Sequence, residues 1–229
     1  MSDCVVIYLG TVPYGAALKL QHRLMQLRMQ GDIPDTMLLL QHPPVFTLGR
    51  FKGESDVLSP PEDLKQRGFE VFQTDRGGSV TCHNPGQLVG YPILNLKERS
   101  IGVADYIWKL EETIIRLLSS SGIQAGRVTG KTGVWVSDRK ICSIGIRITE
   151  DVTTHGFALN VNNDLRDFQF IRPCGLSGDI MTSLSEILGK KVEIESLFQE
   201  LTSFFSGIMG MDCKWEDEKW LDAQGGLAG

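Results

Sequence analysis

A glycine-rich loop between two predicted strands is the sequence feature that most limits how this chain can fold. Residues 76–87 read RGGSVTCHNPGQ, and the strand segments SVT and LVGYPIL bracket the loop. Its glycines permit positive φ angles and let the backbone approach a bound group closely. The alternative is a long hairpin turn without a ligand. Neither a GxxxxGK[ST] loop nor a strand-GxGxxG-helix unit is present, so both nucleotide-binding signatures are missing.

Hydrophobic periodicity predicts strands and helices on either side of this loop. The clearest helix is GVADYIWKLEETIIRLLSSSG, residues 102–122, where apolar side chains recur at helical spacing. Further strands are expected at residues 4–9, 37–41, 45–49, 69–74, 154–161 and 190–194. Further helices are expected at residues 13–31, 62–67, 183–188 and 195–208. A hairpin is expected at residues 134–148, with its turn at residues 137–139. The chain therefore reads as α/β, an α+β mixed sheet with flanking helices. We expect one domain over residues 1–229, with 190–229 as its C-terminal helical part.

Composition and charge exclude several classes of function. With 41% hydrophobic and 22% charged residues, the chain is an ordinary globular one. A net charge of −5 and a pI near 5.4 argue against nucleic-acid binding. The start MSDCVVIYLG has no basic segment of a signal peptide, and no apolar run approaches the roughly 18 residues that span a bilayer. We expect a cytoplasmic protein without a membrane partner.

The five cysteines indicate free thiols. They are odd in number and widely scattered, with no CxxC pair and no His/Cys metal spacing. Free thiols fit a reducing compartment better than disulfides do. We therefore expect no metal and no cofactor.

One cysteine is a candidate nucleophile. Cys174 lies in the tripeptide PCG. A lone cysteine is more often a small buried hydrophobe, and a reactive one needs a nearby cation or base. Lys140, His83 and His155 are the candidate partners. Lys140 stands at the head of an otherwise apolar strand face, which is unusual for lysine, although a hairpin lysine in solvent is the commoner arrangement.

The motifs together resemble one enzyme family. RGGSVTCHNPGQLVGYPIL, KICSIGIRI, THGFALNV and PCG follow one another in the order found in lipoyl(octanoyl) transferases, and LLLQHPPVFTLGR matches as well. The similarity covers residues 5–190. These enzymes, octanoyl-[acyl-carrier-protein]:protein N-octanoyltransferases, move octanoyl from acyl carrier protein to a lysine of lipoyl domains. The resemblance implies the catalytic-domain fold of lipoate ligases and biotin ligases.

The resemblance also implies residue roles and partners. Cys174 would form an acyl-thioester and Lys140 would exchange protons with it, without ATP. The donor would be octanoyl-acyl carrier protein, and the acceptors would be lipoyl domains of 2-oxoacid dehydrogenase complexes and the glycine cleavage H protein. By resemblance the substrate site is lined by Arg76, Gly77, Gly78, Ser79, Val80, Thr81, Cys82, His83, Ser143, Ile144, Gly145, Gly156, Phe157 and Ala158.

Several positions depart from the family pattern. Cys82-His83-Asn84 stands where most relatives carry Tyr-His-Gly, and Cys142 replaces a small alanine. Cys142 shares a predicted strand face with Lys140, so it is either core filler or a second thiol near the acyl pocket.

Two rival functions and one docking surface follow from the same residues. The rivals are an ATP-dependent lipoate or octanoate ligase, which would not require the thiol of PCG, and a catalytically silent binder of acyl carriers or lipoyl domains.

Because acyl carrier proteins are typically acidic and this chain is too, we expect a local basic patch at the mouth of the site. Its candidate residues are Arg50, Lys52, Arg76, Arg147 and Arg172.

Overall fold

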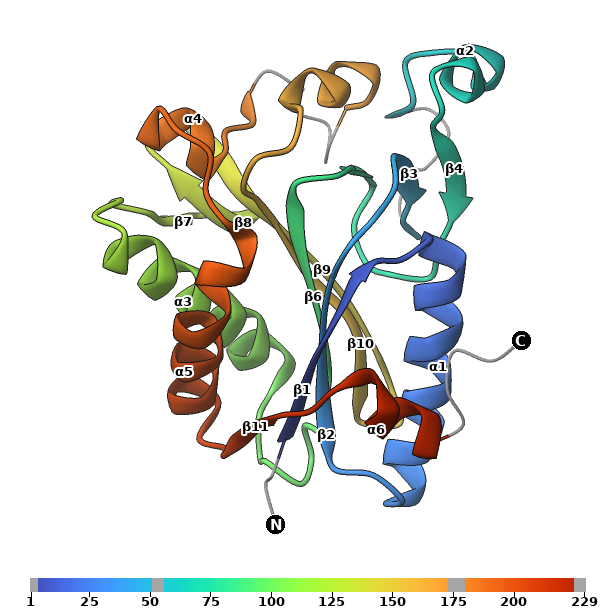
Figure 1. The fold of residues 1–229 in the computed structure, drawn as a ribbon, viewed down its shortest axis with the longest axis vertical. Coiled ribbons are helices and arrows are strands. Elements are labelled where there is room, and N and C mark those ends of the chain that lie inside the picture. The colour runs from blue at the N-terminus through green and yellow to red at the C-terminus, as the bar shows by residue number, and fades with distance from the viewer. Residues whose placement is uncertain (1–3, 51–55, 173–179, 225–229) are drawn as a thin grey trace.

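The computed structural model describes residues 4–50, 56–172 and 180–224. The strands of its large sheet are β1 Cys4–Thr11, β2 Asp35–Gln41, β6 Gln87–Ile93, β7 Gly126–Val128, β8 Lys131–Val136, β9 Arg139–Thr149, β10 Val152–Asn160 and β11 Cys213–Trp215. Within the described ranges the order is β11-β1-β2-β6-β10-β9-β8-β7 (Figure 1). The β1 strand pairs in parallel with β2 and β11, and the other neighbours are antiparallel. The prediction of a mixed sheet with flanking helices is confirmed.

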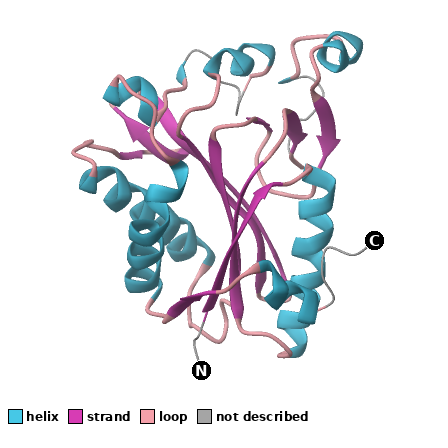
Figure 2. Cartoon of the chain, in the orientation of Figure 1, coloured by secondary structure: helices cyan, strands magenta, loops and turns pink. Residues whose placement is uncertain are grey.

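Helices cover both faces of this sheet (Figures 1 and 2). The helices of the described ranges are α1 Tyr14–Gln30, α2 Pro61–Gln66, α3 Val103–Ser120, α4 Leu184–Leu188, α5 Phe198–Met209 and α6 Glu218–Ala223, with 3-10 turns η2 Leu165–Phe170 and η5 Ile194–Leu197. Helices α3 and α5 pack on one face, and α1 and α6 on the other. Helix α1 follows Pro13 and ends at Gly31, whose φ of 80° suits a glycine C-cap.

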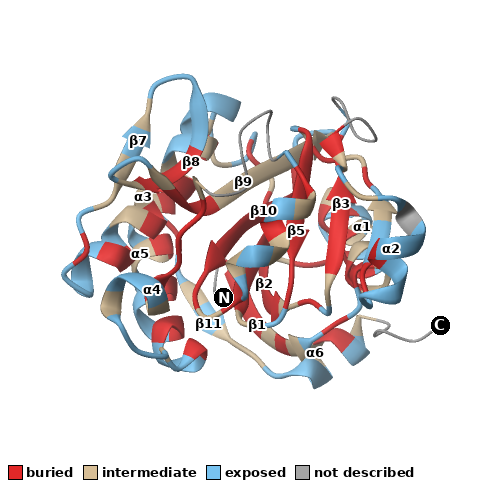
Figure 3. Ribbon diagram, turned by 90° about the horizontal axis from the view of Figure 1, so that it is seen from above, coloured by how far each residue is buried: buried red, intermediate tan, exposed pale blue. Residues whose placement is uncertain are grey.

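Strand alternation explains how two cores form around one sheet. Val5 and Ile7 of β1 face α1, whereas Cys4 and Val6 face α3 and α5. Both sets are buried, so the strand reads as a continuous apolar run. Seen from above, β2, β5 and β10 are buried while the outer faces of the helices are exposed (Figure 3).

A second sheet lies beside the large one and carries the glycine-rich loop. Its strands β3 Val45–Leu48, β4 Glu70–Gln73 and β5 Val80–His83 have the order β4-β3-β5. The apolar side chains Phe46, Leu64 and Phe168 are fully buried in its core. Within the glycine-rich run 76–87, residues 80–83 form β5, so its first two glycines lie between β4 and β5 and its last glycine lies between β5 and β6.

One predicted strand is wrong, and three short elements were missed. Residues 190–194 form a loop because the side-chain amide of Asn162 bonds both backbone groups of Val192, accepting from its N–H at 2.9 Å and donating to its C=O at 2.7 Å. These bonds replace the ladder partners of a strand. The missed elements are β7, β11 and α6.

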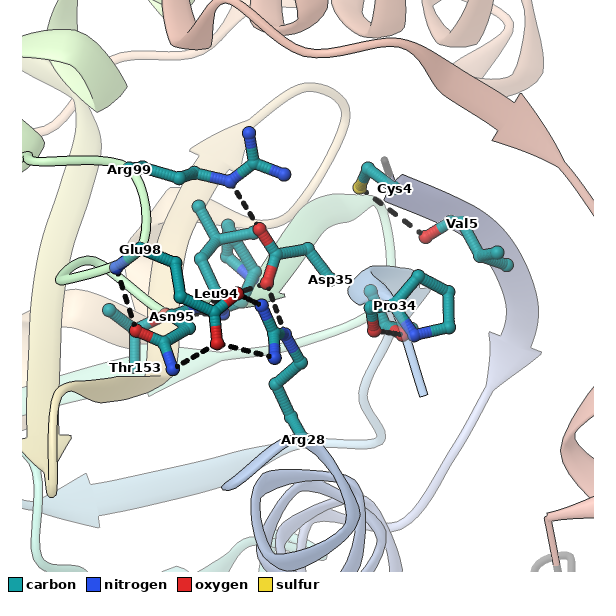
Figure 4. Close-up of polar contacts among 12 residues, drawn as sticks. Cys4, Val5, Arg28, Pro34, Asp35, Leu94, Asn95, Glu98, Arg99 and Thr153 are labelled. Atoms are coloured by element: carbon teal, nitrogen blue, oxygen red, sulfur yellow. Dashed lines mark hydrogen bonds and ion pairs between the residues drawn. The ribbon is translucent and has the colours of Figure 1, made fainter. Parts of the chain in front are cut away.

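A buried ion cluster joins the end of α1 to the start of β2 (Figure 4). The carboxylate of Asp35 accepts hydrogen bonds from Arg28 Nε at 2.7 Å, from the Asn95 N–H at 3.0 Å and from Arg99 Nε. The Asp35 side chain is fully buried. Glu98 pairs with the far side of the Arg28 guanidinium. Two carboxylates and two arginines thus meet at this junction, with Asp35 bonded to both arginines.

We expect Asp35→Ala to lower the free energy of unfolding by about 3–5 kcal/mol, because it removes the buried carboxylate that bonds both guanidinium groups and leaves the largely exposed Glu98 as the carboxylate partner of Arg28. Urea denaturation monitored by circular dichroism measures the loss. Lys214→Ala is the control, since it removes only the exposed pair with Glu216 and should leave stability almost unchanged. Equal effects of the two substitutions would contradict a stabilising role for the cluster.

Candidate active site

A single cavity collects most of the predicted site residues. It lies between the glycine-rich loop, β5, β9 and β10 and has a volume of about 560 Å³, counting its open mouth. The predicted substrate-binding residues other than Ser79 and Cys82 line it, together with Lys140. Tyr14, Tyr91 and His155 complete the wall. The structure therefore brings together residues that are far apart in the sequence.

Backbone hydrogen bonds dock the glycine-rich loop on β9 and β3. The N–H of Gly77 donates to the Ile146 carbonyl at 2.9 Å, and the N–H of Arg50 donates to the Arg76 carbonyl at 3.0 Å. A Cβ on Gly145 would lie 3.2 Å from the Gly77 carbonyl, so the two backbones approach closely. This close approach shapes one side of the cavity.

The predicted basic patch is only partly present. Arg76 is buried, and its guanidinium donates to Thr47, with Nη2 2.6 Å from the carbonyl oxygen. Arg147 pairs with Asp75 at 3.2 Å. Including Arg76 in a surface patch was therefore wrong, because its charge stabilises the loop from inside. Arg50 and Arg172 are exposed, and Lys52 lies outside the described residues.

Ser79 and Cys82 do not line this cavity, so the structure does not bring them together with the other predicted substrate-binding residues. The Ser79 hydroxyl donates to the Asp56 carboxylate. Cys82 is fully buried in the core of the small sheet, and burial raises the pKa of its thiol well above the usual value. The physical reason is strand alternation in β5: Thr81 and His83 point to the cavity, so Cys82 points away.

Lys140 is buried at the start of β9. Its Nζ lies 5.6 Å from the centre of the Trp135 ring, and its backbone carbonyl accepts from the Thr182 N–H at 3.0 Å. Gly133 on the neighbouring strand makes room for it, since a Cβ there would lie 2.5 Å from Lys140 Cε. This glycine contact depends on strand register, so no local pattern in the sequence predicts it.

Lys140 also belongs to a second hollow. That hollow is lined by Ile107 of α3, by Lys131 and Trp135 of β8, and by Lys140 itself, and it shares the glycine-rich loop with the first cavity. The lysine therefore stands in a wall common to two openings.

Cys174 lies outside the described residues. On its N-terminal side, the N–H of Arg172 donates to the Asp56 carbonyl at 2.8 Å. On its C-terminal side, Met181 forms a parallel bridge with Lys140. The described chain thus resumes beside the lysine.

Cys142 is core filler. It is fully buried among side chains that pack against α3 and does not line either hollow. A register shift separates it from Lys140: Cys142 pairs with Val134 while Lys140 pairs with Trp135, so β9 has one extra residue between the pairs. Burial raises the pKa of the Cys142 thiol to about 12, which leaves it protonated and unreactive.

Three buried histidines stand beside the cavity. Burial lowers the pKa of His42 to about 4, that of His83 well below 6.5, and that of His155 below 6.5. His155 adopts a φ of 57°, and its Nε2 lies 2.8 Å from Asp75 Oδ1. The hydrogen bond from His155 is the main reason that the pKa of Asp75 falls to about 2. His155 thus orders the residue that precedes Arg76.

Comparison with known proteins identifies relatives over nearly the whole chain. Residues 13–206 match the family described as lipoyl protein ligase A/B catalytic domain. An octanoyltransferase from Caldicellulosiruptor saccharolyticus is 45% identical over 219 residues, covering 95% of this chain and 93% of the relative. One from Alkaliphilus metalliredigens is 42% identical over 208 residues, covering 90% and 95%.

Solved structures share the fold. Lipoate-protein ligase A bound with ATP matches with a TM-score of 0.78 at 16% identity, covering 98% of this chain and 93% of that one. Biotin protein ligase from Aquifex aeolicus matches with a TM-score of 0.53 at 15% identity, covering 92% and 70%. The predicted relation to lipoate and biotin ligase folds is confirmed.

We expect Gly133→Ala to lower the free energy of unfolding by about 1–3 kcal/mol, because the new Cβ overlaps both Lys140 Cε and the Cys142 carbonyl oxygen. Gly126→Ala is the matched control, since a Cβ there meets no heavy atom within 4 Å. In a double-mutant cycle with Lys140→Ala, part of the loss should disappear. Purely additive losses would show that the lysine stem does not fill this space.

Stability should fall as the pH is lowered from 7 to 5. A native His42 with a pKa of about 4 binds fewer protons in this range than the unfolded state, whose histidine has a pKa near 6.5. His42 alone should reduce the free energy of unfolding by about 2 kcal/mol at pH 5. Urea midpoints measured across this range test the sign, and His42→Gln should flatten the curve. A curve that rises toward pH 5 would contradict the buried neutral state.

Proposed function

The chain belongs to the octanoyltransferases of the lipoyl protein ligase A/B catalytic domain family, and from this premise we propose that it acts through a thioester on Cys174. It is an octanoyltransferase enzyme. We propose acyl carrier protein as the octanoyl donor and a specific lysine of lipoyl domains as the acceptor. The observation that carries the proposal is the position of Lys140. This residue lies in the wall between two hollows, and it forms a bridge with Met181, which comes after the PCG segment in the chain.

The first half-reaction moves the acyl group onto the enzyme. Lys140, as the amine, takes the proton of the Cys174 thiol, and the thiolate attacks the carbonyl of the donor thioester. The carbon–sulfur bond to the carrier breaks, and the Lys140 ammonium returns the proton to the leaving thiolate. The products are octanoyl-Cys174 and the free carrier thiol.

The second half-reaction makes the amide. The amine of the acceptor lysine attacks octanoyl-Cys174, the bond to sulfur breaks, and the proton lost from the attacking nitrogen passes through Lys140 to the Cys174 sulfur. An amide is more stable than a thioester, so no ATP is needed. Ile144 and Phe157, which are among the residues that line the cavity, are apolar and suit an eight-carbon chain.

The wider assignment follows from the same premise. We propose that residues 1–229 form one catalytic domain that works in the cytoplasm. The acceptors would be the lipoyl domains of 2-oxoacid dehydrogenase complexes and the glycine cleavage H protein, and the reaction would be the first step of endogenous protein lipoylation. No helix in the described ranges is both long and apolar enough to cross a bilayer.

An ATP-dependent ligase is the second candidate, because lipoate-protein ligase A bound with ATP shares the fold. Such a ligase would activate the free acid as an adenylate and would work without a thiol. The PCG segment favours transfer from a thioester, and the two mechanisms predict different adducts.

Intact-protein mass spectrometry separates these mechanisms. Mixed with octanoyl-acyl carrier protein in the absence of ATP, the wild type should gain one octanoyl group, Cys174→Ser should gain none, and Lys140→Ala should gain it at least about a hundredfold more slowly. Cys142→Ala is the matched control and should react as the wild type does. An adduct that persists in Cys174→Ser, or transfer that requires ATP and free octanoate, would overturn the proposal.

A further inference from the structure

A chain of side-chain amides connects the strand of Lys140 to His83. The Thr182 N–H donates to the Lys140 carbonyl at 3.0 Å. Asn160 Nδ2 donates to the Thr182 carbonyl at 3.0 Å, and Gln87 Nε2 donates to Asn160 Oδ1 at 2.9 Å. Gln87 Oε1 then lies 2.7 Å from His83 Nδ1. Every link is buried, so each amide has a defined orientation.

These contacts fix which nitrogen of His83 carries the proton. Because Asn160 Nδ2 faces a backbone carbonyl, Asn160 Oδ1 must be the acceptor. Gln87 Nε2 donates to that oxygen and also to the Cys82 carbonyl at 3.2 Å, which leaves Gln87 Oε1 to face His83. His83 Nδ1 therefore donates, and Nε2 keeps its lone pair.

No neighbouring donor in the described ranges satisfies that lone pair. The Tyr91 hydroxyl lies 2.8 Å from His42 Nε2, and it donates there because His42 Nδ1 already donates to the Val12 carbonyl at 2.6 Å. Tyr14 stacks on the His83 ring, and its hydroxyl lies 3.5 Å from His155 Nδ1. His83 is 5% exposed and lines the cavity, so its Nε2 can accept only from a group that enters there.

The ring stays neutral in this position. Burial is the main cause of the low pKa of His83, and the neighbouring His42, Arg76 and His155 lower it further. A neutral Nε2 acceptor cannot bond the carbonyl oxygen of a thioester, and an octanoyl chain carries no donor. In the proposed reaction the acceptor lysine brings N–H groups to the acyl carbon.

We propose that His83 Nε2 accepts a hydrogen bond from the amine of the acceptor lysine during the second half-reaction, and that Gln87 is the positioning residue that holds His83 in this tautomer. The inference rests on the proposed function. Nε2 directs one N–H away from the thioester, so that the nitrogen lone pair points at the acyl carbon. His83 would then select for amine transfer without taking part in acylation of the enzyme.

The test measures the two half-reactions separately in His83→Phe, His83→Gln and Gln87→Leu. In His83→Phe, formation of octanoyl-Cys174 from octanoyl-acyl carrier protein should stay within about twofold of wild type. Single-turnover transfer from the isolated octanoyl-enzyme to a lipoyl domain should slow on the order of tenfold to a hundredfold, the effect of one hydrogen bond to a reacting group. Gln87→Leu should show the same split. His83→Gln should recover part of the rate, because its amide oxygen can accept.

Two controls separate this effect from damage to the site. Gln26→Leu makes the same change as Gln87→Leu at an exposed glutamine of α1, and it should leave both steps unchanged. Free hydroxylamine, which needs no positioned lysine, should remove the octanoyl group as octanohydroxamate from the His83→Phe and wild-type octanoyl-enzymes at equal rates. Unchanged transfer in His83→Phe, or equal loss in both half-reactions, would overturn the inference. Failure of the wild type to form octanoyl-Cys174 would instead overturn the proposed function.

Discussion

Burial of the Lys140 side chain is the constraint on which the site depends. A lysine is seldom buried, and here three features make it possible. The extra residue of β9 turns Lys140 away from the core that encloses Cys142. Gly133 leaves space for the methylene stem, and the Trp135 ring lies beside the ammonium. The start of β9 also forms a bridge with Met181, which comes after the PCG segment in the chain. The placement of the amine, the shape of the cavity wall and the bridge to Met181 therefore all depend on the geometry at the start of β9.

The large sheet explains why the site lies where it does. Helices α1 and α6 cover one face and α3 and α5 the other. The cavity lies where the small sheet brings the glycine-rich loop against β9. The contact between Gly77 and Ile146 spans many residues of chain, and it forms only when both sheets are folded. The cavity is thus a product of tertiary packing, and its residues cannot be positioned by a local segment alone.

Local patterns predicted most of the fold, because strand alternation and helical spacing act over a few residues. They failed where a tertiary contact decided the outcome: Asn162 turns residues 190–194 into a loop, and β11 exists because it pairs with β1. For the site, the order of the motifs in the sequence predicted that the glycine-rich loop and the strands β9 and β10 come together. The roles that the resemblance assigns to their residues stay predictions. Tyr91 and His42 were missed, since no spacing in the sequence links them to His83.

Neutral histidines suit a site in which a lysine amine is the nucleophile. Lys140 and an incoming lysine must share a small space, and each carries a positive charge when protonated. A charged His83 would repel both, whereas a buried imidazole offers a lone pair without adding charge. The free energy of unfolding falls in acid as a consequence, because the histidines bind protons in the unfolded chain at a pH where they stay neutral in the native protein. The hydrogen-bonded amides of Thr182, Asn160 and Gln87 fix the orientation of one another, and none of them carries a charge. An uncharged scaffold that holds a neutral acceptor opposite a lysine is what a site for amine transfer requires.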